Sequence, residues 1–514
     1  MFLRTVQARG RKGEKHEYLR LVETYREDGH TKQRVVMNLG RKDLLAPHLD
    51  GLVRILGGEG AVSDWVRASE VKPDEAACWG EVLVARHLWQ ELGLDVILDD
   101  GKGKKSPDGA SLGERAFVLV VNRLCSPGSE HHLASWLETD FVCDRSGRRW
   151  LPPWEEHGRV QVNLTWLQHW YRTLDKLMER KEAIEQSLYL KLRDLFSLRA
   201  ELVFYDLTST YFEGEGPEEL GQHGYSRDGK PHNEQVQIGV VMVNGWPIAH
   251  HIFPGNWRES KTVEGVLDDL ERRFGLKRVV FVGDRGMVTS DNLAMLRERQ
   301  QGYLVGLQRR RREDVYELIV KATGPWQECP PRMGVKADKS ARTLVQEVAG
   351  DQPGVRVFVV HSEERLAYER AMRERAMERT RVELEKLQRR VAEGKLKAAE
   401  KIGAAAAHIL IRNHGHRYYG WEVEKGKFRY FEHSNLEREK AYEGKYLIQT
   451  EEQNLTPVDA VSAYKELSEV ERTFRCLKDV IEMRPIYHRQ DGRVRGHIFV
   501  AVLAFLLKRA LEKK

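Results

Sequence analysis

The chain has 514 residues, of which 41% are hydrophobic and 32% are charged, and its formal net charge is +6. This composition excludes a disordered chain and leaves enough length for several domains with buried cores. The mildly basic balance permits nucleic acid as a partner without requiring it. The five cysteines are scattered without a C-x-x-C pair, which argues against a zinc knuckle and for a reducing compartment.

The N-terminal stretch MFLRTVQARGRKGEK lacks the apolar core of a signal peptide. The longest apolar run, residues 497–507, is too short to cross a bilayer and predicts a buried helix. We therefore expect a cytoplasmic protein that does not enter a membrane.

Residues 1–45 predict an N-terminal β-hairpin arm. Residues 18–26 and 31–39 have strand-like sequences, and Asp28-Gly29 between them is a strong turn signal. Arginine and lysine recur along both strands. They suit a DNA-facing arm and a solvated surface equally well.

Residues 46–198 predict a mostly helical region for DNA binding or dimerisation. Apolar residues recur at helical spacing in four segments, 81–92, 112–124, 129–139 and 164–198. The break at 126–128 gives the middle pair the form of a helix-turn-helix, but most such pairs are ordinary packing units. Base recognition by this pair is therefore not indicated.

Residues 199–312 predict the first part of a catalytic core, because strands and helices alternate there. The expected strands are 201–206, 235–243, 247–253, 278–283 and 302–307, and the expected helices are 261–274 and 291–300. Asn244-Gly245 predicts a tight turn between the second and third strands. This order is that of an RNase H-like fold, a mixed sheet flanked by helices.

Residues 313–450 predict an insertion subdomain. Short strands are expected at 355–361, 418–423, 427–431 and 446–450, together with a charged helix over 363–401. That helix fits a solvated helix or an antiparallel helical hairpin. Residues 451–514 predict the second part of the core, with helices at 455–481 and 496–512.

Two aspartates follow apolar strands in the predicted core, Asp206 after 201–206 and Asp284 after 278–283. The carboxyl edge of an open α/β sheet is where functional groups gather. Taken singly, each aspartate caps a turn as often as it binds a metal.

A third carboxylate is expected from the helix over 455–481. Tyr464, Glu471 and Lys478 are seven residues apart and lie roughly on one helical face, with Arg475 four residues beyond Glu471. We expect Asp206, Asp284 and Glu471 to bind two Mg²⁺ ions, for which Mn²⁺ would substitute. Arg285 and Lys478 would then neutralise phosphate charge.

The segments around these acids resemble the DDE transposases of bacterial insertion sequences. The segments YDLTSTYFE and GDRGM resemble that family's two aspartate regions, and the text MRPIYHRQDGRVRGHIF after the glutamate also agrees. The resemblance is to the group whose glutamate helix carries Y-x2-R-x3-E-x6-K. Here the signature is Tyr464, Leu467 in place of arginine, Glu471 and Lys478.

The resemblance implies a Mg²⁺-dependent enzyme of cut-and-paste DNA transposition, acting by two-metal phosphoryl transfer. It implies cleavage at the transposon end, a hairpin intermediate and strand transfer into target DNA. Leu467 leaves the hairpin a hypothesis, because leucine cannot hold DNA by charge. Trp421, in the insertion, fits either a flipped-base platform or the core, and the core is favoured.

The implied partners are transposon-end and target double-stranded DNA, with a homodimer in the synaptic complex and a nucleoid-associated, cytoplasmic location in bacteria. The residues expected to contact DNA are Tyr464, Lys478, Arg475, Arg285, Arg484 and Arg495. His250, His251 and His497 are expected to be structural.

Two other functions remain open. One is an RNase H-like, structure-specific nuclease without strand transfer. The other is a non-catalytic DNA-binding protein derived from a transposase, which is disfavoured because all three acidic positions are filled.

Overall fold

The computed structural model describes residues 2–9, 15–27, 30–45, 76–99, 110–150, 164–196, 202–284, 286–287, 289–307, 313–331, 341–350 and 352–514. The chain divides into two compact units, Met1–Ala76 and Ala77–Lys514. The two units are described separately.

The N-terminal unit contains a three-stranded antiparallel sheet in the order β1-β2-β3. Its strands are β1 (Phe2–Arg9), β2 (Lys15–Glu27) and β3 (His30–Arg41), and α1 (Lys42–Leu45) follows. The predicted hairpin is confirmed as β2 and β3, while β1 is an additional strand. The predicted turn at Asp28-Gly29 lies outside the described residues.

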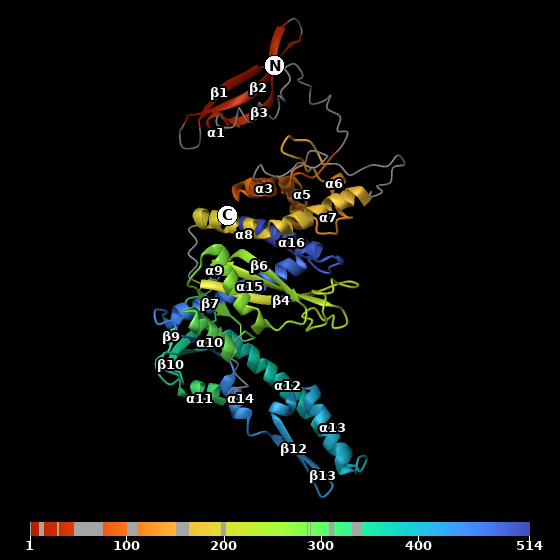
Figure 1. The fold of residues 1–514 in the computed structure, drawn as a ribbon, viewed down its shortest axis with the longest axis vertical. Helices are drawn as coiled ribbons and strands as arrows, with labels where there is room; N and C mark the ends of the chain where they lie inside the picture. Colours follow the sequence, from red (N-terminus) through yellow and green to blue (C-terminus); the bar gives the residue numbers. More distant parts are fainter. Residues whose placement is uncertain are drawn as a thin grey trace. The chain divides into compact units, whose positions relative to one another are not determined.

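The second unit is built on a mixed sheet of nine strands, in the order β6-β5-β4-β7-β8-β14-β11-β10-β9 (Figure 1). Its first half consists of β4 (Leu202–Tyr211), β5 (Gln235–Val243), β6 (Trp246–Pro254), β7 (Val280–Gly283) and β8 (Gly302–Gly306). Strands β4, β7 and β8 are parallel, whereas β5 and β6 are antiparallel. The short 3₁₀ helix η2 (Glu259–Lys261) leads into α9 (Val263–Phe274), and α10 (Ser290–Glu298) connects β7 to β8. This part of the sheet confirms the predicted RNase H-like arrangement.

One detail of β4 differs from the prediction. The strand was expected to end at residue 206, but it continues to Tyr211. The reason is its antiparallel partner, because β5 pairs with β4 as far as Tyr211↔Gln235 while β7 ends at Gly283. Asp206 therefore lies inside a strand, just beyond the parallel pairing.

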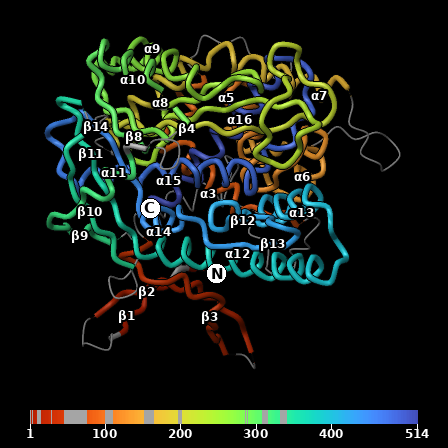
Figure 2. The backbone as a smooth tube through the Cα atoms, turned by 90° about the horizontal axis from the view of Figure 1, so that it is seen from below, coloured from red at the N-terminus to blue at the C-terminus, as the bar shows by residue number. Residues whose placement is uncertain are grey.

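The second half of the sheet comes from the predicted insertion. Strand β14 (Lys445–Thr450) pairs antiparallel with β8, and β11 (Arg356–Ser362), β10 (Thr343–Ala349) and β9 (Gln327–Glu328) follow it (Figure 2). The expected strands at 355–361 and 446–450 are present, and they continue the core sheet. The region also contains α11 (Glu313–Lys321), η4 (Gly415–Arg417) and α14 (Leu436–Tyr442).

A smaller group of elements has a hydrophobic core of its own. It consists of α12 (Glu363–Ala392), α13 (Ala399–Arg412) and the two-stranded sheet β12 (Tyr419–Glu424) and β13 (Lys427–Glu432). Leu384, Ile402 and Phe428 are buried at its centre. The charged segment thus forms two packed helices, and Trp421 packs over Gly403 in this core, in agreement with the favoured alternative.

The helical region contains six helices among the described residues: α3 (Gly80–Glu91), α4 (Leu94–Leu98), α5 (Leu112–Cys125), α6 (Leu133–Thr139), α7 (Leu164–Glu179) and α8 (Lys181–Phe196). The single helix expected over 164–198 is instead two helices that break at Arg180. No helix in the described part of the chain is apolar over enough of its length to span a membrane.

The C-terminal helix α16 (Asp491–Glu512) joins the helical region to the sheet (Figure 1). Its apolar run is buried on all sides, against α5 and α7 and against β6. A helix that is apolar all round is stable only inside a core. The helices and the sheet therefore share one hydrophobic core.

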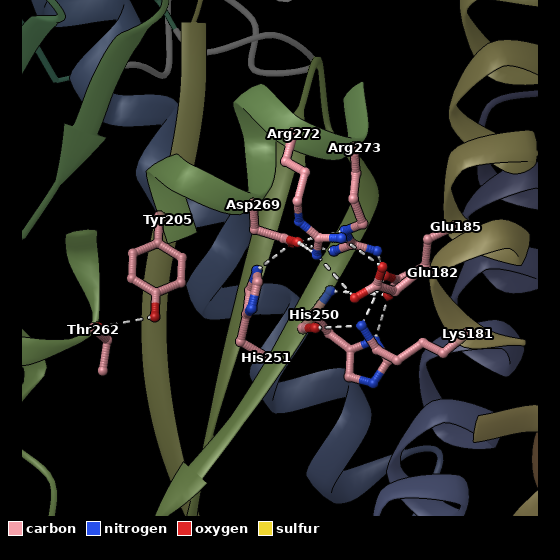
Figure 3. A network of polar contacts seen from close by, with 10 residues as sticks. All are labelled: Lys181, Glu182, Glu185, Tyr205, His250, His251, Thr262, Asp269, Arg272 and Arg273. Atoms are coloured by element: carbon pink, nitrogen blue, oxygen red, sulfur yellow. Dashed lines mark hydrogen bonds and ion pairs between the residues drawn. The ribbon is translucent and has the colours of Figure 1, made fainter. Parts of the chain in front are cut away.

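A network of buried charges fastens α8 to strand β6 at the edge of the sheet and to helix α9 (Figure 3). Glu185 accepts hydrogen bonds from Lys181 Nζ at 2.8 Å and from Arg273 Nη1 at 2.5 Å, and it lies 2.7 Å from His250 Nδ1. Although burial opposes ionisation, Lys181, His250 and Arg273 hold the pKa of Glu185 well below its usual range. His251 lies 3.5 Å from Asp269, the other partner of Arg273. Both histidines therefore have structural contacts, as expected.

We predict that Glu185→Gln lowers the free energy of unfolding by about 3–5 kcal/mol, because it leaves Lys181 and Arg273 buried without their shared counter-ion. Glu182→Gln is the matched control, since Glu182 pairs with Arg272 on the surface with 60% of its side chain exposed. We expect that control to cost less than about 1 kcal/mol. Urea unfolding at pH 7 measures both, and equal costs would contradict a central role for the buried network.

Candidate active site

The pairing of β4 with β7 brings the two aspartates together. Phe204 pairs with Val282 in parallel register, so that two residues further on Asp206 is level with Asp284. Paired residues of parallel strands point to the same face of the sheet. Phe204 and Val282 both belong to the core that packs under α15 (Pro457–Asp479). The two aspartates therefore belong to the face that α15 covers.

Helix α15 begins where its sequence signals indicate. Thr456 accepts a hydrogen bond from the backbone N–H of Asp459 at 3.1 Å, and Pro457 occupies the first turn. Leu467, Val470 and Phe474 are buried in the core. These apolar residues fix the rotation of the helix and leave Glu471 exposed beside them.

Asp206, Asp284 and Glu471 line one cavity of about 1000 Å³. Tyr464, Lys465, Leu467 and Ser468 of α15 contribute to the same cavity. The other lining residues come from β8, the β9–β10 segment, α12 and β14. Carboxylates that are 265 positions apart in sequence, Asp206 and Glu471, thus border a common space.

The electrostatics of this cavity favour a bound cation. Burial, with smaller contributions from Asp284 and Glu259, raises the pKa of Asp206 to about 7 against the opposing effects of the Leu207 N–H and Arg227. The Leu207 N–H donates to Asp206 Oδ1 at 2.8 Å. A divalent cation would supply the positive charge that a buried carboxylate lacks, and carboxylate oxygens are the hard donors that Mg²⁺ and Mn²⁺ prefer. The donor set therefore fits such an ion.

The residues predicted to contact DNA have different environments. Tyr464 lines the cavity and stacks on Tyr446, with 6.0 Å between ring centroids. Arg475 is exposed and forms no ion pair with any residue that the structure describes. Arg495 pairs with Asp491 at 2.6 Å. Arg285 lies outside the described residues.

Lys478 and Arg484 are held by an acid that sequence reasoning did not single out, Asp228. Lys478 Nζ donates to Asp228 Oδ1 at 2.9 Å, and Arg484 donates to the same oxygen. Only 9% of the Lys478 side chain and 3% of the Asp228 side chain are exposed. Lys478 is therefore engaged inside the protein.

Two further charged residues near the cavity were also missed. Arg227 pairs with Glu259, and a Cβ at Gly286 would lie 1.9 Å from Glu259 Oε2, so that Glu259 touches the backbone two residues after Asp284. The available signal was the adjacent opposite charges of Arg227-Asp228 in the glycine-bounded segment GYSRDG. Their partners lie far away in sequence, so the pattern alone did not identify them.

A second polar cluster lies away from the cavity. His488 is 3.5 Å from Glu130, and His497 Nε2 is 2.9 Å from the carbonyl oxygen of Met483. The carboxylate of Glu130 and the imidazoles of His488 and His497 each have an atom within 4.8 Å of the other two. However, Arg123 Nη2 lies 3.5 Å from His497 Nδ1, so a metal ion there would face a buried guanidinium. We interpret this cluster as an anchor for α16.

Comparisons with known proteins agree with this geometry. Residues 200–507, more than half of the chain, match the family model described as a transposase DDE domain. Residues 3–61 match the model of the N-terminal domain of IS1634 family transposases. No curated protein matches the chain.

We predict that Asp206→Asn stabilises the metal-free protein at pH 8 by about 1–3 kcal/mol, because one pKa unit corresponds to about 1.4 kcal/mol. The ordinary pKa of 3.8 applies to the unfolded chain and the raised value of about 7 to the folded one. The parent protein therefore loses stability as the pH rises between these two values. The extra stability of Asp206→Asn over the parent should disappear near pH 4. Urea unfolding in a chelating buffer at both pH values measures this.

Asp479→Asn is the control for this experiment, because the Asp479 side chain is 51% exposed and water solvates its charge, so this substitution should not stabilise the protein at pH 8. A metal-free Asp206→Asn protein that is less stable than the parent at pH 8 would contradict the prediction.

Proposed function

The chain belongs to the DDE transposases of insertion sequences, and from this premise we propose that it carries out cut-and-paste transposition of its own element. Enzymes with this domain cleave DNA and transfer strands. The observation that carries the proposal is that Asp206, Asp284 and Glu471 border one cavity.

In this proposal the three carboxylates hold Mg²⁺, and Mn²⁺ substitutes for it. Divalent cations bound there would activate the attacking oxygen and stabilise the leaving oxygen of a phosphodiester. The burial of Asp206 and its raised pKa support this assignment, since the carboxylate gains most from a nearby positive charge.

The DNA would lie across the open side of α15. We propose that Tyr464, which lines the cavity, and Arg475, which is exposed, contact the transposon end. Arginine suits this role because its guanidinium pairs with phosphate oxygens in two places. Lys478, Arg484, Arg495 and Arg285 complete the proposed set, with Lys478 and Arg484 adding positive charge while they remain bound to Asp228.

Four reactions follow one another at this site in the proposal. Water first cuts one strand at the transposon end and releases a 3′-OH. That hydroxyl then attacks the opposite strand, which forms a hairpin and frees the element. After the hairpin is opened by water, the 3′-OH attacks target DNA. Two ends must be joined together, so we propose a homodimer that acts on nucleoid DNA.

Leu467 stands where the signature has arginine, and its environment indicates that another residue supplies the positive charge. Leu467 is buried in the core and borders the cavity with an apolar surface. The nearby Arg472 pairs with Glu469 at 2.5 Å. Arg475 is therefore better suited to supply the missing charge.

A structure-specific nuclease without strand transfer is the alternative, because both enzymes would use the same carboxylates. A non-catalytic DNA-binding protein fits less well, since it would not need all three acids around one cavity.

We predict that Asp206→Asn and Glu471→Gln each lower Mg²⁺-dependent cleavage of the transposon end by more than about 100-fold, at least the effect of losing a group that supports a metal ligand. Binding of the same DNA should change by less than about 3-fold, because phosphate contacts supply most of it. Gel assays of cleavage and binding measure both. Cleavage that persists in either variant would remove that residue from the metal site, and cleavage without strand transfer in the parent protein would favour the nuclease.

We predict that a transposon-end duplex with one strand already cut is converted into a hairpin, seen on a denaturing gel as a product of doubled length. Arg475→Ala should lower the hairpin yield about ten-fold, the loss expected for one charged hydrogen bond. Arg472→Ala is the matched control and should have little effect. Linear products alone from the parent protein would eliminate the hairpin step.

A further inference from the structure

Arg227 and Asp228 are adjacent in the segment between β4 and β5, and they bind partners on opposite sides of the cavity. Arg227 pairs with the carboxylate of Glu259, and Asp228 pairs with the side chains of Lys478 and Arg484. No role is assigned to this dipeptide by the proposed function.

Arg227 is attached to the side of the cavity that carries the aspartates. Its backbone N–H donates to Ser209 Oγ at 3.0 Å, and Ser209 lies three residues after Asp206 on β4. Its guanidinium pairs with Glu259, which touches the backbone at Gly286. Arg227 thus contacts the surroundings of both Asp206 and Asp284.

Asp228 is attached to the side that carries the glutamate. Lys478, its partner at 2.9 Å, lies seven residues after Glu471 on α15, which is about two helical turns. Arg484, its other partner, follows the end of the same helix and also pairs with Asp479. Because Asp228 and Lys478 are almost fully buried, this contact is a fixed part of the fold.

The segment itself is held firmly by other contacts. Asn233 Nδ2 donates to the carbonyl oxygen of Phe212 at 2.9 Å, and Gln235 Nε2 donates to that of Lys230 at 2.9 Å. A Cβ at Gly224 would lie 2.0 Å from the carbonyl oxygen of Gly255, so the backbones are in close contact there. A segment fixed in this way can transmit position from one side of the cavity to the other.

We propose that Arg227 and Asp228 form a bridge that positions Glu471 relative to Asp206 and Asp284 and thereby sets the affinity of the site for divalent cations. This inference rests on the proposed function, in which these three carboxylates hold the cations. Apolar packing fixes which face of α15 meets the sheet, and hydrogen-bonded ion pairs, which are directional, add a second constraint on where the helix lies. Residues that orient metal ligands are often as important to a site as the ligands.

A purely electrostatic role for the same residues predicts a different result. Removing the positive charge of Arg227 beside Asp206 would by itself strengthen cation binding, and removing the negative charge of Asp228 would weaken it. If the two residues position Glu471, both substitutions weaken cation binding. The direction of the change in Arg227→Gln therefore separates the two roles.

The experiment is a titration of the full chain with Mn²⁺, in which free Mn²⁺ is followed by electron paramagnetic resonance. The binding that disappears in Asp206→Asn defines the carboxylate site. We expect Arg227→Gln and Asp228→Asn each to raise its half-saturating Mn²⁺ concentration about ten-fold, the usual effect of losing a group that orients a metal ligand. Arg258→Gln is the matched control, because Arg258 is an exposed cation next to Glu259 whose side chain forms no ion pair with the described residues, and it should not weaken binding.

Arg227→Gln alone distinguishes the positioning role from the electrostatic one, even if Asp228→Asn does not fold. Because 38% of the Arg227 side chain is exposed, replacing it should leave the fold intact. Unchanged or tighter Mn²⁺ binding in Arg227→Gln overturns the bridge while leaving the carboxylate site in place. Binding that is the same in the parent and in Asp206→Asn overturns the carboxylate site, and the bridge with it.

Discussion

Asp206 is a carboxyl group inside a β-strand, with 7% of its surface exposed, and water cannot solvate its charge there. Its pKa of about 7 expresses that cost. An ionised carboxylate at this position costs free energy in the protein alone, and a nearby cation makes the ionised form favourable. The other elements around the cavity bring two further carboxylates, Asp284 and Glu471, to the space that Asp206 borders.

The sheet solves the problem of bringing Glu471 back to the aspartates. The chain leaves the core after β8 and returns with β14, and the two strands pair directly. Four strands of this region, β14, β11, β10 and β9, therefore extend the core sheet. Six residues separate the end of β14 from the start of helix α15, which begins at a signal of Thr456 and Pro457 and crosses the face where the aspartates lie.

Buried ion pairs recur wherever elements distant in sequence meet. Glu185 joins α8 to β6 and α9, and Asp228 joins the β4–β5 segment to α15. Such pairs add little net stability, since desolvation offsets attraction, but they select one arrangement over its neighbours. For the proposed reaction, which needs carboxylates placed around a phosphodiester, a single arrangement matters more than extra stability.

Local patterns in the sequence determined much of the fold. Strand β5 lies at the predicted residues 235–243, and Asn244-Gly245 forms the turn to β6. Helix α15 lies where apolar residues at helical spacing predicted it, and α16 lies where the longest apolar run predicted it. These features depend on contacts between near neighbours, which spacing and residue type reveal. The acids Asp206, Asp284 and Glu471 were recognisable because each stands in a distinctive short segment.

Only the tertiary structure decided the rest. Nothing local shows that β14 pairs with β8, that β4 runs on past Asp206, or that Asp228 receives Lys478 and Arg484. Each of these depends on a partner that is dozens to hundreds of residues away, and one strand or one acidic residue is compatible with many such partners. The burial that raises the pKa of Asp206 is likewise a property of the assembled sheet and helices, which the residue's own neighbours in sequence do not contain.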